Sequence, residues 1–167
     1  MHQKARNLAH GAVLAAMYAA LCHLQNLLIP GSATWAIQFR AADALCVLAL
    51  FTPSATPGLT AGCFLFNLTY GAALPLDPLV GSAATAVACA LMRLLRKYPY
   101  LTLSFPALTN ALLVGWELTV YIGGGFPLNA LYVALGELAV LYSLGTLIYT
   151  MMNRRGLGSR LFGENGN

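Results

Sequence analysis

The chain has 167 residues, of which 59% are hydrophobic and only 8% are charged. Soluble globular domains carry about 25% charged residues, so this composition excludes an ordinary soluble domain and indicates a membrane protein with several spans. The net charge of +4 does not indicate nucleic-acid binding, because the basic residues flank apolar runs instead of forming one basic surface.

Apolar segments separated by proline and glycine predict an all-α integral membrane protein with six transmembrane helices. The second and third segments are short, so they are either tilted or form a re-entrant hairpin. We expect one membrane domain at residues 1–152 and a short, polar, mobile tail at 153–167. The six segments are residues 8–28, 38–52, 57–73, 77–96, 103–122 and 127–151.

Clusters of basic residues indicate how the helices are oriented in the membrane. Cytoplasmic flanks of spanning helices are enriched in Lys and Arg. Six spans with both termini in the cytoplasm place every cluster on the cytoplasmic side and leave only Arg40 outside. We also expect the first helix to be an uncleaved anchor, because its apolar run is too long for a signal peptide. The clusters are Lys4 and Arg6, then Arg93, Arg96 and Lys97, then Arg154, Arg155 and Arg160.

Small residues form two adjacent rows along the first segment. One row is Ala12, Ala16 and Ala20, and the other is Gly11, Ala15 and Ala19. Small residues at this spacing let helices approach each other closely in lipid. Two interpretations stay open, which are packing inside the bundle and docking of another membrane subunit.

The remaining charged residues of the apolar segments predict an outward-facing polar pocket. A charge near the bilayer centre costs about 2.5 kcal/mol or more, so such residues usually face a cavity or a partner. Acids, amides and aromatic rings together suit a small, flat ligand with several hydrogen-bond donors. The candidate binding residues are Arg40, Asp43, Asp77, Glu117 and Glu137, with Asn67, Asn110, Trp35, Trp116 and Tyr121.

Purely structural interpretations of several candidates also stay open. Arg40 and Asp43 are three residues apart and could pair with each other. Asp77 could cap the helix that follows it. Trp35 and Tyr121 could be interfacial aromatic residues of the kind that line both membrane surfaces.

Sequence motifs for nucleotide hydrolysis, zinc peptidases and serine hydrolases are not found in the chain. The four cysteines have no paired spacing, so we expect neither a disulfide framework nor a metal site. We therefore expect no enzyme activity and no cofactor in this chain. If the protein transports a solute, the energy comes from an ion gradient or from partner subunits.

Five stretches resemble the QueT family over about residues 8–150: "IQFRAADAL", "FTPSATPGLTAGCFLFN", "LDPLVGSAATAVACAL", "PALTNALLVGWEL" and "ALGELAVLYSLG". Members of this family are substrate-binding (S) components of energy-coupling factor (ECF) transporters for queuosine precursors. The resemblance implies a six-helix S-component fold in the plasma membrane of a prokaryote. It also implies a transmembrane coupling subunit and two ATPase subunits, which use ATP and Mg²⁺, and docking through Ala12, Ala16 and Ala20.

The resemblance further implies a 7-deazaguanine substrate, such as 7-aminomethyl-7-deazaguanine, 7-cyano-7-deazaguanine, queuine or the nucleoside. The connection after the first helix would be a lid over the outward-facing site, and the whole S component would topple to deliver its substrate. We expect Glu117 to accept from the guanine-like edge and Glu137 or Asp43 to bind a cationic substituent. Asn67 and Asn110 would bind the other edge, and an aromatic ring would stack on the base. Asp43 stands where the family usually has glutamate.

Three other functions compete with this one. The same fold could bind another nitrogenous vitamin or base, or the chain could be a stand-alone secondary transporter. A membrane enzyme could use Glu117 and Glu137 as general acid and base.

Overall fold

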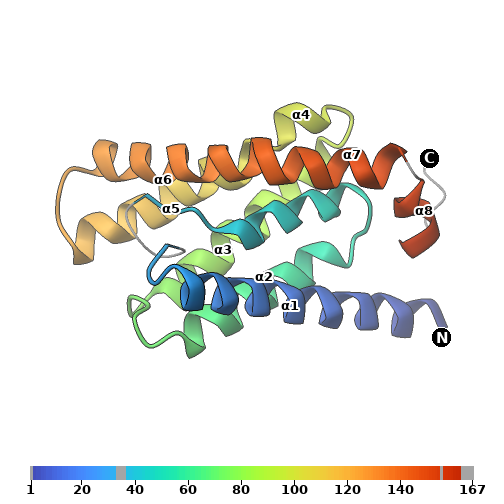
Figure 1. Cartoon of the computed structure of the whole chain (residues 1–167), viewed down its shortest axis with the longest axis horizontal. Coiled ribbons are helices and arrows are strands. Elements are labelled where there is room, and N and C mark those ends of the chain that lie inside the picture. Colours follow the sequence, from blue (N-terminus) through green and yellow to red (C-terminus); the bar gives the residue numbers. More distant parts are fainter. Residues whose placement is uncertain (1, 33–36, 155, 163–167) are drawn as a thin grey trace.

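The computed structural model describes residues 2–32, 37–154 and 156–162, and every regular element within these ranges is helical (Figure 1). Each of the six predicted segments contains a helix, so the predicted all-α class is confirmed. The elements are α1 (His2–Leu28), η1 (Ala41–Leu50), α2 (Ala55–Thr69), α3 (Asp77–Leu94), α4 (Pro99–Thr102), α5 (Phe105–Tyr121), α6 (Phe126–Val140), η2 (Leu141–Gly145), α7 (Thr146–Arg154) and α8 (Leu157–Phe162).

Among the described residues, four helical stretches are long and apolar enough to cross a membrane. The 3₁₀ helix η1 has 10 residues and α2 has 15. At rises of about 2.0 and 1.5 Å per residue, each is about 20 Å long and shorter than the hydrocarbon core of about 30 Å. The six-span topology therefore stays a prediction. The long stretches are Gln3–Leu28, Asp77–Leu94, Pro99–Tyr121 and Phe126–Arg154.

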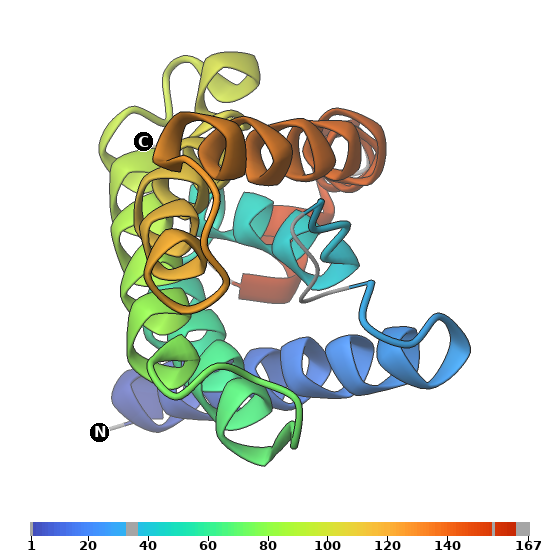
Figure 2. The ribbon, with the colours of Figure 1, turned by 90° about the vertical axis from the view of Figure 1, so that its left-hand side faces the viewer.

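The helix η1 occupies the centre of the bundle. Figure 2 shows it enclosed by α1, α2, α3, α5 and the continuous α6–η2–α7 helix, and it contacts all of these except α5 closely. Its residues 42–49 are all buried. Alanines at positions 41, 42, 44 and 49 leave room for these neighbours. The enclosing ring is open between α1 and α7.

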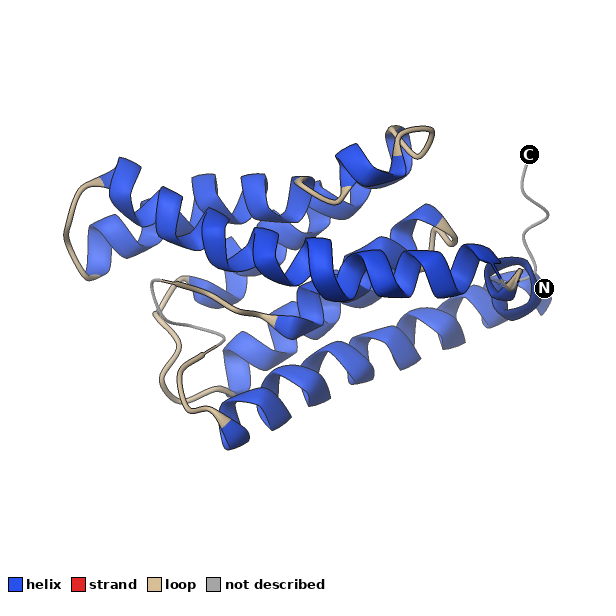
Figure 3. Cartoon of the chain, turned by 45° about the horizontal axis from the view of Figure 1, so that its top comes forward, coloured by secondary structure: helices blue, strands red, loops and turns tan. Residues whose placement is uncertain are grey.

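One end of the bundle, which we call the basic end, gathers the first turn of α1 with α4 and α8 (Figure 1). Arg6 Nη2 donates to the Phe162 carbonyl at 3.5 Å, and Arg93 Nη1 donates to the Ala49 carbonyl at 3.4 Å. Loops also gather at the opposite end (Figure 3), where Arg40 begins η1. The two ends therefore separate the basic clusters from Arg40, in the arrangement that the positive-inside pattern predicts.

The two small-residue rows of α1 have different surroundings. A Cβ atom on Gly58 would lie 2.9 Å from the Cα of Gly11, and one on Gly62 would lie 3.0 Å from the Cα of Ala15. That row is therefore a tight seam between α1 and α2. The other row is exposed along its length: Ala12, Ala16 and Ala20.

The segment that we expected to be a mobile tail contains the short helix α8. Gly156 reverses the chain at a φ of 58° before α8 begins. Phe162 is buried, and its ring meets the His10 ring edge-on at a centroid distance of 5.4 Å. Leu157 also packs against the core. Because these apolar side chains bind α8 to the bundle, the part of the tail up to residue 162 belongs to the fold.

Candidate functional site

A buried hydrogen-bond network links three helices to η1 near the middle of the bundle. The Tyr18 hydroxyl, from α1, donates to Asp43 Oδ1. Asn110 Nδ2, from α5, donates to Asp43 Oδ2 at 3.3 Å and to Glu137 Oε1, from α6, at 2.8 Å. All four side chains are buried. The amide of Asn110 therefore holds two carboxyl groups next to each other.

A second polar cluster lies nearer the opposite end, between α2 and α3. Asn67 Nδ2 donates to the Asp77 carbonyl at 3.1 Å and contacts Cys63 Sγ at 3.5 Å. The Asp77 carboxylate accepts from the Leu74 amide at 2.6 Å, so it fixes the turn before α3. Glu117, from α5, is fully buried beside Asp77 and interacts with it electrostatically.

Arg40 is a buried cation that interacts with both polar clusters. Its Nη1 atom contacts Cys63 Sγ at 3.8 Å, next to the second cluster. Its charge acts on Asp43 and Glu137 in the first cluster and on Glu117 in the second. The acids around it outnumber it, so the site has a surplus of negative charge when these acids are ionised.

The unpaired atoms of this site are hydrogen-bond acceptors. Both carboxyl oxygens of Glu117 and the Oε2 atom of Glu137 are buried without a partner among the described residues. An unpaired buried polar group costs about 1–3 kcal/mol, so a ligand that donates to these atoms recovers that free energy. Across the described residues, no three His, Cys, Asp or Glu side chains are arranged to hold a metal ion. The other unpaired buried oxygens among the described residues are on Gln38, Ser54, Asn67 and Asn110.

The side-chain nitrogens of Asn67 and Asn110 are already used within the protein. Their free atoms are the amide oxygens, which accept hydrogen bonds. We expected these residues to bind the acceptor-bearing edge of a base. In this structure they instead present acceptors, as the carboxylates do.

The connection between α1 and η1 is fastened to the last turns of α1. Gln25 Oε1 accepts from the Ala41 amide at 2.9 Å, and Gln25 Nε2 donates to Ser32 Oγ at 3.0 Å and to the Phe39 carbonyl. Asn26 Oδ1 accepts from the Gly31 amide at 3.0 Å. Gln25 therefore binds both flanks of the predicted lid.

A cavity of about 470 Å³ lies beside this connection at the opposite end. Asp77 and Leu74 line it on one side, and Pro30 and Gly31 line it on the other. Its volume is within the usual range for a small-molecule pocket. The cavity therefore lies between the predicted lid and the second polar cluster.

The predicted aromatic residues do not join the buried clusters. Trp116 is 50% exposed and Tyr121 is 43% exposed, so both lie on the surface of α5, next to the buried Glu117 and Leu118. Trp116 precedes Glu117 by one position, so its side chain points about 100° away from it around the helix, whereas Tyr121 follows Glu117 by four positions and lies on the same side of α5, one turn further along. Their role in base stacking stays a prediction. Trp35 lies outside the described residues.

Two residues of the site were missed by the sequence analysis. Tyr18 looks like an ordinary aromatic residue of an apolar helix, and nothing in the sequence relates it to Asp43. A Cβ atom on Gly81 would lie 2.8 Å from Asn67 Nδ2 and 3.8 Å from Arg40 Nη1. Gly81 therefore leaves space for both polar side chains. The sequence around it, Gly81–Ser82, does not indicate this packing role.

Comparison with known proteins identifies the family of this chain. No curated protein and no solved structure matches it. The model of the QueT transporter family matches residues 8–154. A transporter family with several membrane-type helices indicates a membrane transport protein for a small molecule, and not an enzyme. Since the match covers most of the chain, the chain belongs to the QueT transporter family.

Proposed function

We propose that this protein is the substrate-binding S component of an ATP-driven ECF importer, and that it binds a 7-deazaguanine from outside the cell. The observation that carries this proposal is the set of buried acceptor atoms without donors on Gln38, Asn67, Asn110, Glu117 and Glu137. A 7-deazaguanine is a flat ring with several hydrogen-bond donors, so it complements these acceptor atoms.

The two acids suit different parts of this substrate. The guanine-like edge carries N1–H and a 2-amino group, and the two free oxygens of Glu117 can accept from both. A protonated aminomethyl group, or the secondary ammonium of queuine, suits the pair formed by Glu137 and Asp43. We therefore expect cationic precursors to bind more tightly than neutral ones.

A ligand series tests the assignment of the substrate. Affinities of the purified protein for 7-aminomethyl-7-deazaguanine, 7-cyano-7-deazaguanine, queuine and guanine are compared by calorimetry. We expect the aminomethyl compound to bind about tenfold or more tightly than the cyano compound, which corresponds to about 1.4 kcal/mol. If none of the four binds and another vitamin or base does, the fold is kept but the substrate proposal fails.

The exposed row on α1 supports the proposed assembly with a coupling subunit. Ala12, Ala16 and Ala20 leave a smooth strip along which another membrane helix can approach closely. Two ATPase subunits would then supply the energy through that coupling subunit. Uptake of labelled substrate is measured in cells with and without the coupling subunit. Equal uptake in both would favour a stand-alone secondary transporter and contradict the proposal.

A further inference from the structure

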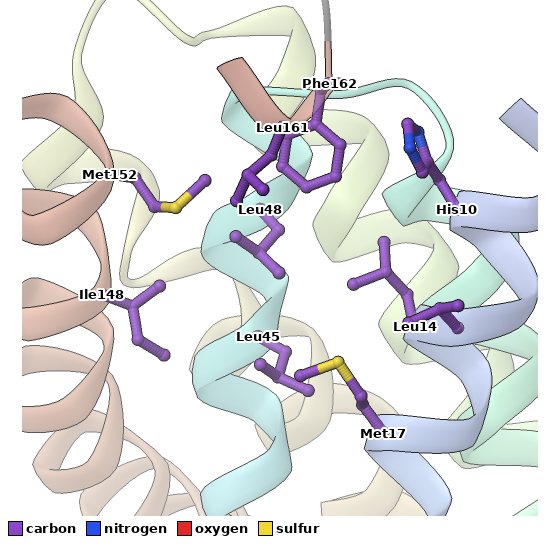
Figure 4. Close-up of a pocket in the computed structure, with 10 residues that line it drawn as sticks. His10, Leu14, Met17, Leu45, Leu48, Ile148, Met152, Leu161 and Phe162 are labelled. Carbon is purple, nitrogen blue, oxygen red and sulfur yellow. The ribbon is translucent and has the colours of Figure 1, made fainter. Parts of the chain in front are cut away.

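A groove of about 440 Å³ runs along the opening of the helical ring, near the basic end (Figure 4). Its walls are Val13 and Met17 of α1 and Ile148 and Met152 of α7, and its floor is formed by η1. Figure 4 shows Leu45 and Leu48 between the two walls, with α8 closing the groove at one end. No part of the site described above lines this groove.

The lining of the groove is apolar and adaptable. Except for His10, every residue that lines it has an aliphatic, thioether or phenyl side chain. Two of them are methionines, whose flexible thioethers adjust to an irregular apolar partner. An apolar groove of this volume suits an alkyl chain.

The rim of the groove at the basic end is positively charged. Arg6 reaches the carbonyl of Phe162, which lines the groove. Arg160 immediately precedes the lining residue Leu161 in α8. Both arginines are exposed. Within the described ranges, no acidic residue lies at this end, so an anion is not repelled there.

His10 lies where the apolar groove meets the basic rim. Its Nδ1 atom is buried and has no hydrogen-bond partner among the described residues. Its ring packs edge-on against Phe162 at the closed end of the groove. A ligand that crosses from the groove to the rim therefore passes a polar atom that lacks a partner.

We propose that this groove binds one acyl chain of an anionic phospholipid of the surrounding bilayer. The alkyl chain lies along η1 between Met17 and Met152. The phosphate group lies at the rim near Arg6 and Arg160, and the ester region passes His10. A lipid combines the two chemistries that the groove and its rim require, an apolar chain and a single anionic head. This site is independent of the transported substrate.

Native mass spectrometry of the delipidated, detergent-purified chain tests this site. The protein is mixed with equimolar phosphatidylglycerol and phosphatidylcholine of identical acyl chains. We expect one phosphatidylglycerol to be retained about fivefold over phosphatidylcholine, because basic residues favour an anionic head. The double variant R6Q/R160Q should lose this preference. The variant K97Q, which removes an exposed charge elsewhere at the basic end, should keep it.

A matched pair of tryptophan variants tests the apolar part. Val13 lines the groove and is 58% exposed, whereas Val120 is 57% exposed and lies on α5 away from it. We expect Val13→Trp to lower phosphatidylglycerol retention about tenfold and Val120→Trp to leave it unchanged. Ile148→Trp replaces Val13→Trp if that variant does not give folded protein, as judged by circular dichroism and gel filtration.

Four results would overturn this inference. The first is equal retention of the two phospholipids by the native chain. The second is an equal effect of Val13→Trp and Val120→Trp. The third is retention of free palmitate as strongly as phosphatidylglycerol, which would make the site one for fatty acids. The fourth is a dimer that Val13→Trp dissociates, which would assign the groove to a second copy of the chain.

Discussion

The helix η1 has polar neighbours on one side and an apolar groove on the other. Toward Tyr18 and Asn110 it presents Asp43, and toward the groove it presents Leu45 and Leu48. Apolar surface in a membrane protein needs only lipid or another apolar surface to cover it. Buried carboxyl oxygens without donors are costly in every environment, and the proposed substrate would supply donors to them. One short helix therefore has the proposed substrate site on one side and an apolar groove on the other.

The largest effect on the polar side is expected from Arg40→Met. Removing the cation leaves several buried acids uncompensated, which costs about 3–5 kcal/mol in the free energy of unfolding. Substrate binding should be lost as well. Unfolding in mixed detergent micelles measures the stability, and Lys97→Met, at an exposed position, is the control and should change it by less than about 0.5 kcal/mol.

A double-mutant cycle shows whether Arg40 and Asp43 act as a pair. Arg40→Met, Asp43→Asn and the double variant are compared with the native chain. A coupling free energy of about 1 kcal/mol or more indicates that the two residues act as a pair. Additive effects would contradict the pairing that their spacing suggests.

A smaller effect is expected from Gly81→Ala. The added methyl group would lie 2.8 Å from Asn67 Nδ2, so the amide must shift away from Asp77. Overpacking of this kind costs about 1–3 kcal/mol in the free energy of unfolding, and we expect weaker substrate binding with it. Gly71→Ala is the matched control, because a Cβ atom there meets nothing within 4 Å. Equal stability of the two variants would show that the space around Asn67 is not limiting.

Glu117→Gln should separate ligand binding from folding. Neither oxygen of Glu117 accepts a hydrogen bond from the described residues, so the neutral amide should leave the free energy of unfolding unchanged or raise it slightly. Binding of 7-aminomethyl-7-deazaguanine should weaken by about 1–3 kcal/mol, because an amide cannot accept two hydrogen bonds as a carboxylate does. An analogue without the 2-amino group should show a smaller loss. An unchanged affinity would remove Glu117 from the site.

The smallest effect on stability and on substrate affinity is expected from Ala16→Trp, since this residue is exposed on α1. Pull-down with the coupling subunit and uptake should both be lost, while the melting temperature stays within about 2 °C. Ala15→Trp is the contrasting variant, because Ala15 is buried in the seam against Gly62 and its replacement should unfold the bundle. Intact assembly of the Ala16→Trp variant would contradict the docking face.

The positions of the helices and the convergence of the charges could be predicted from the sequence. Proline and glycine mark the helix boundaries directly. Charge is so costly in lipid that Arg40 and Asp43 had to be buried together with Glu117 and Glu137, which are far from them in the chain. The family resemblance noted from five sequence stretches is confirmed by the match over residues 8–154.

The partners of these charges could not be predicted, because they depend on the packing of helices. Tyr18 and Gln25 belong to an apolar helix whose sequence does not show which turns face η1. The 3₁₀ form of η1 departs from the short runs usual for this helix and is stabilised by its neighbours. The helix α8 was missed because its six residues include one glycine and one serine and follow a basic stretch that ends in Gly156.

The central position of η1 has a consequence for how the protein is made. A helix about 20 Å long with Arg40 and Asp43 at one end is too short and too polar at that end to insert in a bilayer alone. It is the second helix to emerge from the ribosome, whereas α6 and α7, which pack against it, emerge only after α5. During synthesis η1 therefore has to stay at the membrane surface, or bound to the membrane-insertion machinery, until α6 and α7 have been made. Membrane insertion of this protein is then completed by its C-terminal third.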